Sequence, residues 1–169
     1  AWSFTSRPQD LEELTEFWTD AGRIGTRLEI MRNSISRRLM ERDQTRADAR
    51  PLPPDRARQG ARILAAAATL TQDPTICVPD GSNTSRGIPV REVLPEWDDK
   101  DQSTLLSRPI FDEAIYGAVR FHHRSVREYL TAEWLSDLLK KNASRREIEC
   151  LFFRNQYGVD IIVPSMRPI

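Results

Sequence analysis

The residues best placed to do chemistry are the two histidines of the chain, His122 and His123, which stand side by side in the stretch 120–130. Ser125 and Glu128 follow at the spacing of a capping box, in which the Ser hydroxyl accepts a backbone N–H and the Glu carboxylate reaches back to the cap. A helix that starts at Ser125 leaves His123 just outside its N-terminus. Because that end of a helix presents free N–H groups and a partial positive charge, it is a natural place to bind phosphate. His123 is therefore the candidate to sense an anionic ligand.

A structural role for the tandem histidines is the alternative. A histidine that precedes a helix can pack against its neighbours, or form a hydrogen bond with a nearby carbonyl group through one ring nitrogen. The spacing alone is compatible with both roles, and the structural role is the simpler one.

The segment His123–Tyr129 resembles the His-x-Ser/Thr-Phe-Gln-Glu-Tyr/Phe signature of the NACHT branch of STAND NTPases, which includes NLR-type immune sensors and many bacterial defence proteins. In that family the signature lies in the winged-helix domain that follows the nucleotide-binding domain, and its histidine contacts the β-phosphate of bound ADP. The resemblance implies this role for His123. The chain departs from the signature at Val126, where the family has Phe, and at Arg127, where it has Gln. We expect both on the helix, where they affect packing and surface more than the phosphate contact.

A second similarity lies near the start of the chain. The segment 7–14 resembles the short proline-containing motif that opens the first helical domain of the same family. The proline of that motif packs on the adenine ring, so the resemblance implies this role for Pro8. Proline is also favoured in the first turn of any helix. The two similarities together bracket roughly residues 6–140.

Several kinds of catalytic or metal site are excluded by the motifs. None of the seven glycines forms the GxxxxGK[ST] loop of a P-loop ATPase, so we expect no ATP hydrolysis by this chain alone. Cys77, Cys150 and the two histidines lack CxxC or HxxxH spacing for zinc, and no GxSxG elbow marks a hydrolase. The resemblance implies that ADP or ATP is held mainly by an upstream nucleotide-binding domain of the same protein.

Composition narrows the choice of partners. The 169 residues suffice for one good-sized domain or two small ones. The 25 Lys and Arg residues balance 25 Asp and Glu residues, which gives no reason to expect binding to nucleic acid. The two cysteines are typical of reduced thiols in an intracellular protein, and no apolar run approaches the roughly 20 residues of a membrane span. We therefore expect a cytoplasmic protein that contacts no membrane.

Apolar residues recur at helical spacing in much of the chain. This periodicity predicts helices over residues 10–20, 26–47, 54–70, 98–106, 125–141 and 144–157. The three prolines in Pro51–Pro54 stop a helix and mark a boundary between two helical units. Strand-forming residues between Ile110 and His122 predict a hairpin whose turn lies either at Asp112 and Glu113 or at Gly117.

The order of these elements predicts a mainly α fold, with a helical domain followed by a winged-helix domain that carries a small β-hairpin. We assign residues 1–50 to helical domain 1, residues 54–141 to the winged-helix domain and residues 142–169 to the start of a further helical unit. Small residues along 54–70 would let a second helix approach closely.

The function implied by the resemblance is a nucleotide-sensing switch in a bacterial immune or anti-phage defence protein. In the ADP state His123 would hold the winged helix against the nucleotide-binding domain, and release would expose a surface for self-oligomerisation. The parent protein would be an ATPase. The alternative is a helical scaffold or a DNA-binding winged helix with no nucleotide role. The acidic residues of the helix 98–106 would repel DNA phosphates, which makes nucleic acid an unexpected partner.

Overall fold

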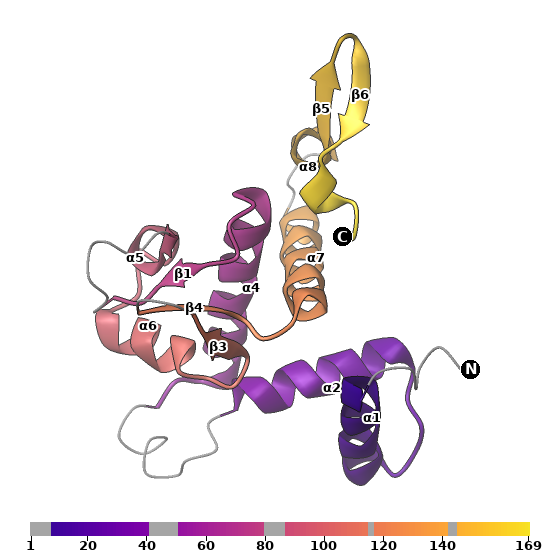
Figure 1. Cartoon of the computed structure of the whole chain (residues 1–169), viewed down its shortest axis with the longest axis vertical. Helices are drawn as coiled ribbons and strands as arrows, with labels where there is room; N and C mark the ends of the chain where they lie inside the picture. The colour runs from indigo at the N-terminus through magenta and orange to yellow at the C-terminus, as the bar shows by residue number, and fades with distance from the viewer. Residues whose placement is uncertain (1–7, 41–50, 80–86, 115–116, 142–144) are drawn as a thin grey trace.

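The computed structural model of the chain is mostly helical, with two small sheets (Figure 1). At residues 8–10 it describes the backbone alone. The residues that it describes are 8–40, 51–79, 87–114, 117–141 and 145–169. Within these ranges no helix is long and apolar enough to cross a membrane.

Two helices that pack against each other come first in the described part of the chain: α1 (Pro8–Ala21) and α2 (Arg27–Leu39) (Figure 1). Thr26 caps α2, because its hydroxyl accepts the N–H of Glu29 while the Glu29 carboxylate accepts the N–H of Thr26. The predicted continuation of α2 beyond residue 40 lies outside the described residues.

The longest pair of packed helices is α4 (Pro54–Leu70) and α7 (Arg124–Lys140) (Figure 1). The α4 helix starts at the predicted residue, where proline is tolerated because the first N–H of a helix needs no partner. Its residues Ala57, Ala61 and Ala65 are fully buried. Small side chains at these positions leave room for neighbouring elements to pack closely on α4, and α7 is one of the elements that pack there.

A four-stranded sheet lies beside α4 (Figure 1). Its order is β2-β1-β4-β3, with β1 and β2 parallel and the other pairs antiparallel. The strands are β1 (Ile76–Cys77), β2 (Ile88–Pro89), β3 (Phe111–Glu113) and β4 (Ala118–Phe121). The β3–β4 pair confirms the predicted hairpin. Asp112 and Glu113 belong to β3, whereas Gly117, at φ 72°, lies in the connection.

Two short helices connect β2 to β3: α5 (Val90–Val93) and α6 (Asp99–Leu106). Asp98 caps α6 by accepting the N–H of Asp101 at 2.7 Å. The core lies between α4, α6, α7 and the sheet, and α2 contributes Ile35 and Leu39 to it. The first helical unit and the following elements therefore share one buried cluster.

The C-terminal part differs from the sequence prediction. The α8 helix (Arg145–Phe152) ends earlier than the predicted residue 157, and β5 (Phe153–Gln156) and β6 (Val159–Ile162) form a hairpin before the 3₁₀ helix η2 (Pro164–Met166). The helix prediction over 153–157 was wrong. Gly158 turns the chain at φ 79° and donates its N–H to the side chain of Asn155, so a local turn stops the helix there.

Candidate functional site

His123 is the N-cap residue of α7, which starts at Arg124. Its Nδ1 accepts the backbone N–H of Ser125 at 3.2 Å and lies 2.6 Å from the hydroxyl oxygen of the same residue. The predicted capping box at Ser125 is therefore wrong, because the imidazole itself performs the capping role. The carboxylate of Glu128 turns instead to Arg124, whose Nε donates to it at 2.5 Å.

This cap determines which ring nitrogen of His123 can meet a ligand. When Nδ1 accepts a backbone N–H, the neutral imidazole carries its proton on Nε2. Nε2 makes no hydrogen bond to any described residue and is not one of the buried polar atoms without a partner. The helix thus holds the ring by one nitrogen and presents the other as a free N–H donor.

His123 lines an open cleft of about 340 Å³ where β4 leads into α7. We call this the histidine cleft; its described lining residues are Pro74, Arg120, Phe121, His122, His123, Arg124 and Arg127. Three of them are arginines and none carries a carboxylate. The cleft combines a helix N-terminus, an N–H donor and several guanidinium groups, which is the chemistry that binds phosphate. The half-buried His123 is therefore not sealed in an apolar interior.

His122 performs the structural role that was the alternative for the pair. Its Nδ1 lies 3.2 Å from the carbonyl oxygen of Ile110, which accepts its proton, and its Nε2 is buried with no hydrogen-bond partner among the residues that the structure describes. Burial lowers the pKa of His122, and the positive charge of Arg38 lowers it further. The two neighbouring histidines thus differ in environment. His122, after β4, bonds to the carbonyl of Ile110, just before β3, whereas His123 presents its Nε2 in the histidine cleft.

Arg120 and Arg127 are cleft residues that the sequence did not single out as a site. Arg127 lies one turn into α7, at a position where the signature that this segment resembles has Gln, and it lines the cleft rather than only the outer surface. Its Nε is buried and has no hydrogen-bond partner in the described part of the chain, and burial lowers the pKa of Arg127. Arg124 and Arg127 are three positions apart on a predicted helix, and residues at this spacing are neighbours on the helix surface. The sequence could therefore have predicted that both arginines lie near one face.

Pro8 is the first residue of α1, as expected for a proline that opens a helix. Its side chain lies outside what the structure describes. The contact of Pro8 with an adenine ring therefore stays a prediction.

Other candidate chemistry is sparse in the described ranges. They contain no group of three or more His, Cys, Asp or Glu residues that could hold a metal ion. Burial raises the pKa of the Cys77 thiol, and Cys77 and Cys150 form no disulfide. On α6, Asp99 pairs with Arg91 and Asp101 pairs with Arg56, each at 2.8 Å, so the acidic face predicted from the sequence is partly neutralised.

Comparison of the chain with known proteins identifies no relative. No protein-family model matches the chain, and no curated protein or solved structure is significantly similar to it. The likeness to NACHT proteins therefore depends on the segments His123–Tyr129 and 7–14.

Proposed function

We propose that this chain is the regulatory segment of a NACHT-type STAND NTPase, in which His123 senses a nucleotide held by the nucleotide-binding domain of the same protein. The observation that carries the proposal is the geometry of one side chain. His123 is fixed at Nδ1 by the start of α7 and presents Nε2 in a cleft lined by arginines. A donor held in this way needs no reorganisation when a phosphate arrives.

The order of elements from α4 to β4 supports a winged-helix assignment for this part of the chain. Helix α4 is followed by the strands β1 and β2, the helices α5 and α6, and the β3–β4 hairpin, and β1 pairs with both β2 and β4. The hairpin would be the wing. The segment His123–Tyr129, which carries the resemblance, follows this hairpin directly.

The mechanism that we propose is a switch between two arrangements. With ADP bound, the Nε2–H of His123 donates a hydrogen bond to the β-phosphate and holds the segment against the nucleotide-binding domain. A charge-assisted hydrogen bond contributes about 1.5–3 kcal/mol, which biases an equilibrium tenfold or more. The nucleotide shifts the equilibrium only because it binds the closed arrangement better than the open one. Exchange for ATP, with a trigger, would release the segment and expose a surface for self-oligomerisation.

The setting that fits this function is the cytoplasm of a bacterium, in an immune or anti-phage defence protein. The described residues contain no helix that could span a membrane. ADP and ATP are the proposed ligands, bound mainly by the neighbouring domain.

The test uses two substitutions of His123 in the full-length protein. Asparagine is a good N-cap residue, so His123→Asn keeps the start of α7 while its shorter side chain loses the Nε2–H donor. His123→Ala loses both functions. We expect both variants to retain at least about tenfold less ADP after purification and to assemble without a trigger. Bound nucleotide and oligomer size are measured by chromatography of the extracted nucleotide and by light scattering.

The two variants separate the phosphate contact from the cap. Only His123→Ala should lower the melting temperature, because it alone removes the helix cap. If His123→Asn retains ADP and remains monomeric like the wild type, His123 does not sense the nucleotide and the proposal fails.

A further inference from the structure

We infer that Arg127 is a second phosphate anchor of the histidine cleft, so that the cleft binds a chain of two phosphates rather than a single phosphate oxygen. The ligand class is a pyrophosphate group, either free or as part of a nucleoside diphosphate. That the pyrophosphate group belongs to a nucleotide rests on the proposed function. Binding of pyrophosphate by the chain itself can be tested separately.

The charges of the cleft are not equally available to a ligand. Arg124 is already paired with the carboxylate of Glu128. Arg127 makes no side-chain hydrogen bond or ion pair to the residues that the structure describes, and its buried Nε has no partner. Glu128 acts on Arg127 only as a nearby charge. Among the described residues, the guanidinium at the α7 N-terminus that has no ion pair is therefore that of Arg127.

The helix places Arg127 next to His123. The N–H of Arg127 donates to the carbonyl oxygen of His123 at 3.4 Å, so the two residues are one turn apart and lie on the same side of α7. His123 offers a single N–H donor at Nε2, whereas a guanidinium offers a planar fork that matches two phosphate oxygens. Together they suit two linked phosphates.

An anion would also relieve a cost that Arg127 bears in the free chain. A buried donor without a partner destabilises a protein, because it has lost its hydrogen bonds to water. The burial that lowers the pKa of Arg127 also lowers the local dielectric constant, which strengthens its attraction for a nearby anion. Arg120 of β4, which is exposed and has no ion pair among the described residues, adds positive charge at the rim.

The test titrates the 169-residue chain with inorganic pyrophosphate and, separately, with orthophosphate at low salt. Binding is followed by NMR at the backbone amides of Ser125 and Arg127 and at the Nε–H of Arg127. We expect saturable binding of pyrophosphate, at least about tenfold tighter than orthophosphate, because the second anchor acts only on the second phosphate. Arg127→Gln, which restores the residue of the family signature, should weaken pyrophosphate binding about tenfold, and Arg127→Lys should have an intermediate effect.

Arg124→Gln is the matched control, because it removes the same charge from the same helix turn where the guanidinium is already paired. It should weaken binding by less than about threefold. Equal losses in Arg127→Gln and Arg124→Gln would mean that only net charge matters, and absence of saturable pyrophosphate binding would mean that there is no site; either result overturns the inference. Thr131 donates to the backbone carbonyl of Arg127, so the substitution leaves the helix bonding intact.

The two proposals fail separately. If Arg127→Gln abolishes pyrophosphate binding while full-length His123→Asn keeps its ADP, the anchor stands and the sensing role of His123 fails. If His123→Asn loses ADP while Arg127→Gln binds pyrophosphate like the wild type, only the second anchor is refuted.

Discussion

At the scale of single residues, the adjacent histidines show how burial assigns different roles to identical side chains. The ring of His123 caps a helix and keeps Nε2 free at a basic cleft. The ring of His122 is held by the carbonyl of Ile110 and has its second nitrogen buried. Both residues are histidines, so the residue type does not distinguish them. His122 lies at the end of a strand and is structural, whereas His123 lies at the start of a helix and is the candidate sensor.

His122 should make stability depend on pH. Its pKa is lowered in the folded state, so below the unfolded value of about 6.5 the unfolded chain binds the proton more readily. The free energy of unfolding should therefore fall as the pH drops from 7.5 to 5.5, because charging the ring is opposed by burial and by Arg38 and only partly favoured by Asp112.

The matched variant is His122→Gln, whose amide can still donate to Ile110 but cannot titrate. Between pH 7.5 and 5.5, the free energy of unfolding of the wild type should fall by up to about 1 kcal/mol more than that of His122→Gln. Urea denaturation measures both. A parallel pH dependence in the two proteins would show that His122 titrates normally in the folded state.

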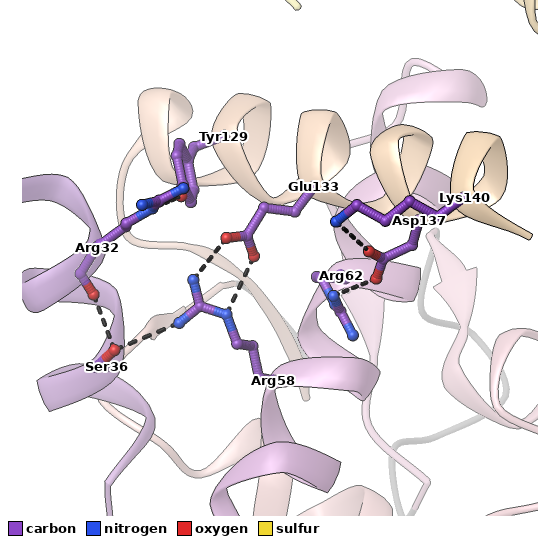
Figure 2. A network of polar contacts seen from close by, with 8 residues as sticks. All are labelled: Arg32, Ser36, Arg58, Arg62, Tyr129, Glu133, Asp137 and Lys140. Atoms are coloured by element: carbon purple, nitrogen blue, oxygen red, sulfur yellow. Dashed lines mark hydrogen bonds and ion pairs between the residues drawn. The ribbon is translucent and has the colours of Figure 1, made fainter. Parts of the chain in front are cut away.

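At the scale of elements, a row of polar contacts joins α2, α4 and α7 outside the apolar core (Figure 2). Arg58 of α4 donates to both carboxylate oxygens of Glu133 on α7, at 2.7 and 3.1 Å, and to the hydroxyl of Ser36 on α2 at 3.3 Å. One turn further along, Arg62 pairs with Asp137. One guanidinium thus connects the first helical unit to both long helices.

We expect the Arg58–Glu133 pair to contribute more than an exposed pair. Both side chains are about three-quarters buried, at 25% and 21% exposure, and the contact is two-pronged, so a double-mutant cycle with alanine should give a coupling of about 1 kcal/mol. Arg145 and Glu149 on α8 form the control pair, at 2.6 Å but largely exposed, with an expected coupling of about 0.3 kcal/mol. Similar couplings for the two pairs would refute a special role of the Arg58 contact.

At the scale of the whole molecule, the chain leaves the core after α7 and then returns to it. The β5–β6 hairpin projects away from the rest of the molecule (Figure 1), and all its residues are exposed. The following turn, η2, contacts α4 and buries Met166 to 2% exposure. A stretch after the hairpin therefore stabilises a helix that lies about a hundred residues earlier in the sequence.

Met166 should matter for stability although it lies near the end of the described chain. We expect Met166→Ala to lower the free energy of unfolding by about 2–3 kcal/mol, because it leaves a cavity against α4. Val159→Ala in the exposed hairpin is the control, with an expected change within about 0.5 kcal/mol. Thermal or urea denaturation measures both, and an equally small effect of Met166→Ala would contradict the packing of η2 on α4.

The sequence by itself determined the features that depend on neighbouring residues. Pro54 marked the start of α4, apolar periodicity the helix near residues 98–106, and strand-forming residues the β3–β4 hairpin, because prolines and side-chain periodicity act over a few positions. The same local reasoning placed His123 at the start of a helix, although it assigned the cap to Ser125. It failed at 153–157, where a turn at Gly158 outweighed the helical pattern.

Only the tertiary structure decided which distant side chains meet. Pro74 joins the arginines around His123, and Arg58 reaches Glu133 although 75 positions separate them. No local pattern encodes such contacts, because they depend on how α4, α7 and the sheet bury their apolar faces together. That packing brings three arginines to one cleft and leaves Arg127 without an ion-pair partner among the described residues. Neither the charge balance of the chain nor the spacing of its residues fixes where each guanidinium meets a carboxylate.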